Sequence, residues 1–146
     1  MKLRPRPSRI ILPYLLLYFL VITASYFPVA ITWPPTLTHY VVLGLWTIAF
    51  TIFIIIGLRY NSYEIHKNTL VHIKGKERLN YNFADIIYID EKHSRKHKTL
   101  LFYTNKGDER HLVLDPKGIL LEKTLERAKN VVSYDEFHRR FPKTKL

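Results

Sequence analysis

The sequence predicts a membrane α+β protein, in which an N-terminal transmembrane helical hairpin is followed by a small antiparallel β-barrel or roll capped by a C-terminal helix. Three observations support this fold class. No Asp, Glu, Lys or Arg lies in the 49 residues from Ile10 to Leu58. All 12 acidic residues and 19 of the 23 basic residues follow that stretch. The residues after it alternate apolar and polar side chains, which is the period of a half-buried strand.

The uncharged stretch is long enough for two transmembrane helices, since each needs roughly 20 apolar residues to cross the hydrocarbon core. Its middle contains Pro28 and then Trp33-Pro34-Pro35, and these prolines remove backbone donors and disfavour a continuous helix. We therefore expect helices over Ile10–Phe27 and Leu37–Leu58. Pro13 would lie in the first turn of the first helix, where a proline costs little.

Basic residues set the expected orientation of the hairpin. Four of them precede Ile10, none lies in the proline-rich turn, and the chain after the hairpin begins with Arg59. The positive-inside rule therefore predicts a multi-pass protein of the cell membrane with both termini in the cytoplasm. The competing interpretation is a cleaved signal peptide, but the basic C-terminal part would then lie outside, against the charge bias.

Composition divides the chain into four expected parts. These are a basic cytoplasmic tail (1–9), the transmembrane hairpin (10–58), a cytoplasmic domain (59–130) and a short helical C-terminal extension (131–146). With 146 residues and no cysteine, the chain has room for one small domain without disulfides, thiolate nucleophiles or cysteine-bound metals.

The sequence of the cytoplasmic domain predicts six short strands followed by helices. The expected strands are Tyr63–Ile65, Leu70–Ile73, Leu79–Phe83, Ile86–Ile89, Thr99–Thr104 and Glu109–Leu114, with a polar loop at Glu91–Lys98. Asp115 and Pro116 predict a helix start, and the helical period continues to Asn130. Ser133 to Glu136 forms a capping box, so a last short helix should run to Arg140. We expect an inward-facing set made of Leu79, Tyr81, Phe83, Ile87 and Ile89, packed on Leu100 or Leu101 and on Ile119 or Leu120.

This arrangement resembles small bacterial membrane proteins in which a two-helix hairpin precedes a bacterial pleckstrin-homology (PH)-like domain. The likeness lies in Tyr63-Glu64-Ile65, in Leu70 to Gly75, in Phe83 to Ile89 and in Leu100 to Tyr103. The resemblance implies a membrane-proximal binding or regulatory module without catalytic residues. The fold usually has seven strands, whereas six are expected here. The size and hairpin also resemble EbsA-like pore-forming proteins of Gram-positive bacteria, without matching motifs.

The candidate binding residues lie together in the expected loop: Lys92, His93, Arg95, Lys96, His97 and Lys98. A basic cluster close to a membrane gains on the order of 1 kcal/mol per Lys or Arg near anionic lipids. Three interpretations stay open: contact with the membrane surface, a specific headgroup or anion site, and a loop that is merely solvated. His93 and His97 have the spacing of two metal ligands on a helix, but we expect a loop there and therefore no metal site.

Other chemistry finds no support in the sequence. No glycine-rich phosphate loop or nucleophile elbow is present, and adjacent carboxylates such as Asp90-Glu91 would point to opposite faces of a strand. We therefore expect a non-enzymatic protein without cofactors or nucleic-acid partners. It would act as a scaffold or regulator by binding anionic lipid or another membrane protein, with homo-oligomers allowed. The alternative is a small pore-forming or immunity-type protein whose hairpin oligomerises.

Overall fold

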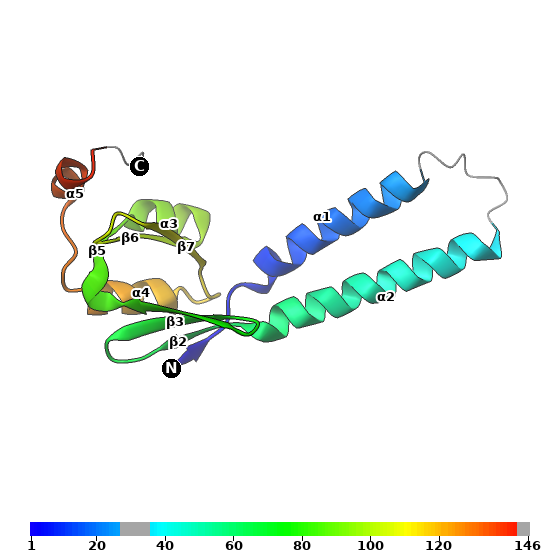
Figure 1. The fold of residues 1–146 in the computed structure, drawn as a ribbon, viewed down its shortest axis with the longest axis horizontal. Coiled ribbons are helices and arrows are strands. Elements are labelled where there is room, and N and C mark those ends of the chain that lie inside the picture. The colour runs from blue at the N-terminus through cyan, green and yellow to red at the C-terminus, as the bar shows by residue number, and fades with distance from the viewer. Residues whose placement is uncertain (27–35, 143–146) are drawn as a thin grey trace. The chain divides into compact units, whose positions relative to one another are not determined.

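The computed structural model describes residues 1–26 and 36–142 (Figure 1). The chain forms two compact units, one made of Pro7–Tyr60 and the other of Met1–Arg6 together with Asn61–Leu146. The predicted proline-rich turn and Phe27, the last residue of the first predicted helix, lie outside the described residues.

The first unit consists of two antiparallel helices, α1 (Pro7–Tyr26) and α2 (Leu37–Tyr60). Both are long and apolar enough to cross a membrane. The first helix begins three residues earlier than predicted, because Pro7 takes the first helical position, where its missing N–H is not needed. Pro13 therefore lies inside α1, and its predicted place in the first turn is wrong.

The two helices are joined by an aromatic and hydroxyl contact. The Tyr18 hydroxyl lies 2.8 Å from Thr47 Oγ1, and Thr47 Oγ1 donates to the Leu43 carbonyl at 2.8 Å. Tyr18 is therefore the donor in the first bond, since the Thr47 proton is already used. The Tyr18 ring also packs edge-to-face on Phe50, with ring centroids 5.2 Å apart.

The second unit contains two antiparallel sheets (Figure 1). The first has the order β1-β2-β3-β4, with β1 at Lys2–Leu3, β2 at Asn61–Ile65, β3 at Thr69–Lys74 and β4 at Glu77–Asn82. A 3-10 helix, η1 (Phe83–Asp85), leads into the second sheet. That sheet has the order β5-β6-β7, with β5 at Ile86–Ile89, β6 at Thr99–Thr104 and β7 at Glu109–Val113. The structure thus confirms all six predicted strands and adds a seventh, β1.

Strand β1 lies in the segment predicted to be a basic tail. It pairs with β2, with Leu3 opposite Tyr63, and the Leu3 side chain is only 9% exposed. Arg6 is bonded to the segment that follows β7. Its backbone N–H donates to the Leu114 carbonyl, and its guanidinium donates to the Pro116 carbonyl. Residues 1–6 are therefore part of the folded unit, and the helical hairpin is inserted between two neighbouring strands of one sheet.

Strand β6 is buried on both faces. Leu100 and Phe102 face a core between the two sheets, which also contains Leu3 and Leu70. Leu101 and Tyr103 face the opposite side and pack with Ile87 and with Phe137 of the C-terminal helix. The extension after residue 130 is therefore integrated into the domain, and Val132 N–H also donates to the Ile87 carbonyl at 2.8 Å.

The predicted core is confirmed for Phe83 and Ile89, which are 2% and 6% exposed. Ile87 is buried in the second cluster instead, because the register shifts between Ile86 and Tyr88 and sends its side chain to the other face. Leu79 is 43% exposed, so its prediction as a core residue is wrong. Leu79 is in register with His72, and His72 with Tyr63, so the three side chains lie on the same face of the sheet. However, Leu79 is on β4, the last strand of that sheet, where it lines a surface cleft.

Three helices complete the unit: α3 (Glu91–His97), α4 (Ile119–Arg127) and α5 (Tyr134–Arg140). The predicted start of α4 at Pro116 is wrong, because Gly118 adopts a left-handed conformation at φ +74° and serves as the N-cap. Asp115 still supports this helix, since its carboxylate accepts from the Leu120 N–H at 2.8 Å. The N-cap of the predicted capping box is confirmed, with Ser133 Oγ accepting from the Glu136 N–H at 3.3 Å, and α5 ends at Arg140 as predicted. The Glu136 carboxylate pairs with Arg140 instead of returning to Ser133.

Leu3 and Leu79 are the two leucines whose burial differs from the prediction. Leu3 was expected in the basic tail and is buried, whereas Leu79 was expected in the core and is exposed. Replacing buried Leu3 by Ala should destabilise the second unit by about 2–5 kcal/mol, because it removes core packing next to Tyr63. Leu79→Ala should change stability by about 0.5 kcal/mol or less, because Leu79 is largely exposed. Both stability changes can be measured from the hydrogen exchange of the β2 and β3 amides in the full chain in detergent. Equal effects of the two substitutions would contradict the packing of β1.

Candidate functional site

The six predicted binding residues lie on or directly after a helix, not in a loop. Asp90 caps the start of α3, and its carboxylate accepts from the His93 N–H at 2.7 Å. Lys98 ends the helix in a left-handed conformation at φ 55°, and its N–H donates to the Ser94 carbonyl. These two ends define a helix of about two turns in a segment that has no hydrophobic repeat. The expected loop is therefore wrong, and the six residues lie on or directly after one short helix.

A buried serine holds α3 on the second sheet. Ser94 is fully buried, and its Oγ accepts from the Leu101 N–H at 2.9 Å. The Leu101 carbonyl in turn accepts from the Asp90 N–H at 3.1 Å. Both polar groups of one β6 residue are therefore bonded to the segment Asp90–Ser94, so the helix is attached to a rigid strand.

The attachment through Ser94 determines which residues of α3 face solvent. Successive residues of an α-helix are about 100° apart, so Lys92 and Lys96 lie opposite Ser94 and form the outermost ridge. Both are exposed. Arg95 lies on one flank and pairs with Glu91 at 2.8 Å. With Lys98 also exposed, the surface of α3 carries four fixed positive charges and one neighbouring carboxylate that is partly neutralised by Arg95.

The other flank of α3 carries the two histidines. The His93 and His97 ring centroids are 4.3 Å apart, and His111 of β7 lies 6.3 Å from His93. His111 Nε2 also contacts Glu109 at 2.6 Å. The helical spacing that metal ligands use is therefore present, contrary to the expectation of a loop. Even so, no three His, Cys, Asp or Glu side chains within residues 1–26 and 36–142 are placed to hold one metal ion.

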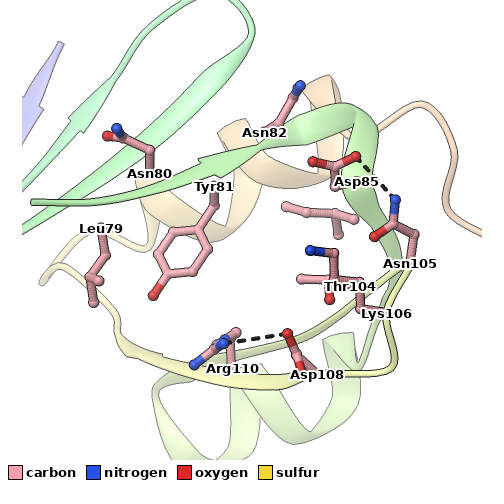
Figure 2. A pocket seen from close by; sticks show the side chains of 11 residues that line it. Leu79, Asn80, Tyr81, Asn82, Asp85, Thr104, Asn105, Lys106, Asp108 and Arg110 are labelled. Atoms are coloured by element: carbon pink, nitrogen blue, oxygen red, sulfur yellow. Dashed lines mark hydrogen bonds and ion pairs between the residues drawn. The ribbon is translucent and has the colours of Figure 1, made fainter.

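A second candidate site is a cleft of about 270 Å³ between β4 and the β6–β7 hairpin (Figure 2). Tyr81 and Arg110 project into it from opposite sides, and Figure 2 shows the Tyr81 ring directed from β4 toward Arg110. Thr104 and Ile86 also line it. None of these residues was among the predicted site residues. Arg110 could have been found, because Leu112 and Leu114 alternate inward along the same segment and place a charged residue in the inward register.

A wider cleft of about 640 Å³ lies beside the end of α4. Its main polar groups are already engaged with the backbone. Arg127 donates to the His66 carbonyl, and Asn130 Nδ2 donates to the Ala84 carbonyl at 2.8 Å. These bonds connect the end of α4 to the β2–β3 turn and the segment after α4 to η1, so we attribute a structural role to this polar cluster.

Comparison with protein-family models, with curated proteins and with solved structures gives no match for this chain. The functional assignment therefore depends on the physical features of the two sites.

The attachment of α3 can be tested at Ser94. Ser94→Ala leaves the buried Leu101 N–H without its acceptor and should destabilise the unit by about 1–3 kcal/mol, although Ala is the better helix former. Lys92→Ala, on the exposed ridge of the same helix, should stay within about 0.5 kcal/mol. Amide hydrogen exchange at Leu101 in the full chain is the measurement. Unchanged protection of Leu101 in the Ser94 variant would refute the proposed anchor.

Proposed function

We propose that this chain is a non-enzymatic membrane protein whose cytoplasmic domain binds anionic lipid headgroups through the basic surface of α3, and so acts as a membrane-proximal scaffold or regulator. The observation that carries the proposal is the exposed ridge of Lys92 and Lys96, with Lys98 beside it, on a helix that is fixed to β6 through Ser94. A rigid basic surface of this kind suits a planar array of negative charges better than a mobile loop does.

Two features support a membrane hairpin with both ends on one side. The helices α1 and α2 have the length and hydropathy of membrane spans. The strands that flank them, β1 and β2, are hydrogen-bonded neighbours, so the chain must return to the side from which it started. The distribution of Lys and Arg favours the cytoplasm as that side. Cleavage of α1 as a signal peptide would remove β1 and its buried Leu3, which counts against that alternative.

The strand count supports the PH-like interpretation of the domain. Sheets of four and three antiparallel strands, followed by a helix, supply the seven strands that the resemblance implies. The seventh is β1, which precedes the hairpin in the sequence. The bacterial inner or plasma membrane as the location follows from this resemblance and is part of the proposal.

The proposed affinity for lipid is modest and depends on tethering. Each Lys or Arg near an anionic leaflet contributes on the order of 1 kcal/mol, so the α3 surface would contribute a few kcal/mol. No linker separates α2, which ends at Tyr60, from β2, which begins at Asn61. A few kcal/mol is enough to orient a domain that is already attached to the bilayer.

The alternative of a pore-forming hairpin has less support. The Thr51 hydroxyl donates to the Thr47 carbonyl at 2.7 Å, and Thr47 itself bonds to Leu43 and Tyr18. These hydroxyls are therefore satisfied within the helix pair and do not form a free polar stripe along α2.

The proposal predicts a charge-dependent approach of α3 to lipid. In nanodiscs containing anionic lipid and a headgroup-attached spin label, the amides of residues 92–98 of the full chain should broaden more than in neutral nanodiscs. The effect should weaken between 0.1 M and 1 M salt, because the screening length falls from about 10 Å to about 3 Å. Replacing Lys92, Lys96 and Lys98 by Gln should abolish the lipid-dependent difference.

The matched control removes three other exposed lysines, Lys67, Lys76 and Lys117. This control variant has the same net charge as the α3 variant but keeps the basic surface of α3. The broadening of its α3 amides should therefore stay close to that of the parent chain. Equal loss in both variants would reduce the effect to net charge and contradict α3 as the site. Broadening of α3 that needs an added membrane protein instead of anionic lipid would assign the surface to a protein partner.

A further inference from the structure

The cleft between β4 and the β6–β7 hairpin is lined by two carboxylates, Asp85 and Asp108, and by two cations, Lys106 and Arg110 (Figure 2). Each carboxylate contacts one donor within the cleft. Asp85 accepts from Asn105 Nδ2 at 3.2 Å, and Asp108 lies 3.5 Å from the Arg110 guanidinium. That second contact is long and involves one of the five guanidinium N–H groups, so most of the hydrogen-bonding capacity of Arg110 is unused.

Two residues with hydroxyl groups, Thr104 and Tyr81, line the same cleft. Thr104 Oγ1 is buried and makes no hydrogen bond among the described residues, which is unusual for a native interior. The Tyr81 ring packs edge-to-face on Phe102, with centroids 5.3 Å apart, and this contact fixes the direction of its hydroxyl. Burial raises the pKa of Tyr81, and nearby Arg110 lowers it less, so the phenol stays protonated and can donate.

We propose that this cleft binds a carboxylate, with the Arg110 guanidinium as its cationic partner and the Thr104 and Tyr81 hydroxyls as neutral donors. A carboxylate supplies acceptors only, and a guanidinium matches its two oxygens in a planar, bidentate geometry. Lys106, which also lines the cleft, adds a second positive charge, and the two cations offset the charges of Asp85 and Asp108. The volume of about 270 Å³ suits one acidic side chain or a small organic acid.

This site is separate from the lipid-binding surface proposed above. Arg110 is the cross-strand partner of Phe102, whose side chain faces the core between the sheets. Helix α3 lies at the opposite face, where the His93 ring is 6.3 Å from that of His111, the neighbour of Arg110 along β7. The carboxylate proposal therefore does not depend on lipid binding, and either one can fail alone.

The test uses the full chain in neutral nanodiscs with labelled methyl groups on Leu79, Ile86 and Thr104, all of which line the cleft. Glutarate is the free-acid probe, and an acetylated, amidated Ala-Glu-Ala peptide is the probe for a protein-borne carboxylate. Inorganic phosphate at the same ionic strength is the third titrant. Saturable methyl shifts with glutarate or the peptide are expected, and the tighter of the two identifies the natural source.

Three substitutions in the cleft separate the proposed roles. Arg110→Gln should weaken the binding of the carboxylate about 10- to 100-fold, because it removes a charged partner. Thr104→Val should weaken it about 2- to 10-fold while leaving the fold intact, because Val has the same shape and removes an unpartnered hydroxyl. Asp108→Asn should tighten binding, because it removes the charge that competes for Arg110. Arg95→Gln on α3 is the control and should have no effect.

Four results of these titrations would contradict the proposal. Absence of saturable shifts with both carboxylate probes would show that the cleft takes no carboxylate. Binding of phosphate alone would assign it to another class of anion. Shifts that are unchanged in the Arg110 variant, or reduced equally by Arg95→Gln, would show a non-specific charge effect. Weaker binding in the Asp108 variant would show that Asp108 contacts the ligand and does not compete for Arg110.

Discussion

Hydrogen bonding between β1 and β2 is the constraint on which the rest of the structure depends. These strands are neighbours in one sheet although the whole of Pro7–Tyr60 lies between them. Closing so long an insertion would be entropically unfavourable for a flexible chain. The insertion is instead a packed helix pair, in which the end of α2 approaches the start of α1. A Cβ added at Gly57 would lie 3.2 Å from side-chain atoms of Ile10 and Tyr14, so the hairpin brings its own two ends together.

The second constraint is the double burial of β6, which builds the domain in layers. Its inward residues pack against the first sheet and α4, and its outward residues pack against α5. Helix α3 is attached to the same strand, because the backbone of Leu101 is hydrogen-bonded to Ser94 and Asp90. The basic surface and the polar cleft therefore adjoin different faces of the second sheet, and β4 of the first sheet forms the other wall of the cleft. This arrangement allows the proposed lipid-binding surface and the proposed carboxylate-binding cleft to coexist in a small domain.

Much of this fold could be predicted, because six strands and the α5 capping box follow from local patterns. The failures have physical causes. β1 has only two residues, Lys2 and Leu3, which is too short for any alternation, and its stability comes from a partner far along the chain. The start of α4 depends on the left-handed conformation of Gly118. The helix α3 has no apolar stripe, and its N-cap Asp90 was considered only as one of two adjacent carboxylates at the end of a strand. The polar cleft depends on tertiary contacts between β4 and the β6–β7 hairpin, which no single segment encodes.

The most direct test of the central constraint is a crosslink between β1 and β2. Lys2 and Glu64 are register partners, and such pairs have Cα atoms about 4.5–5.5 Å apart, within the range of a disulfide. With cysteines at both positions and a protease site inserted near residue 30, oxidised full chain should stay joined after cleavage. Cysteines at Lys2 and Val71, which lies one strand further on, should not join, since about 10 Å separates next-nearest strands. Separation of the two fragments in the Lys2–Glu64 variant would contradict the account.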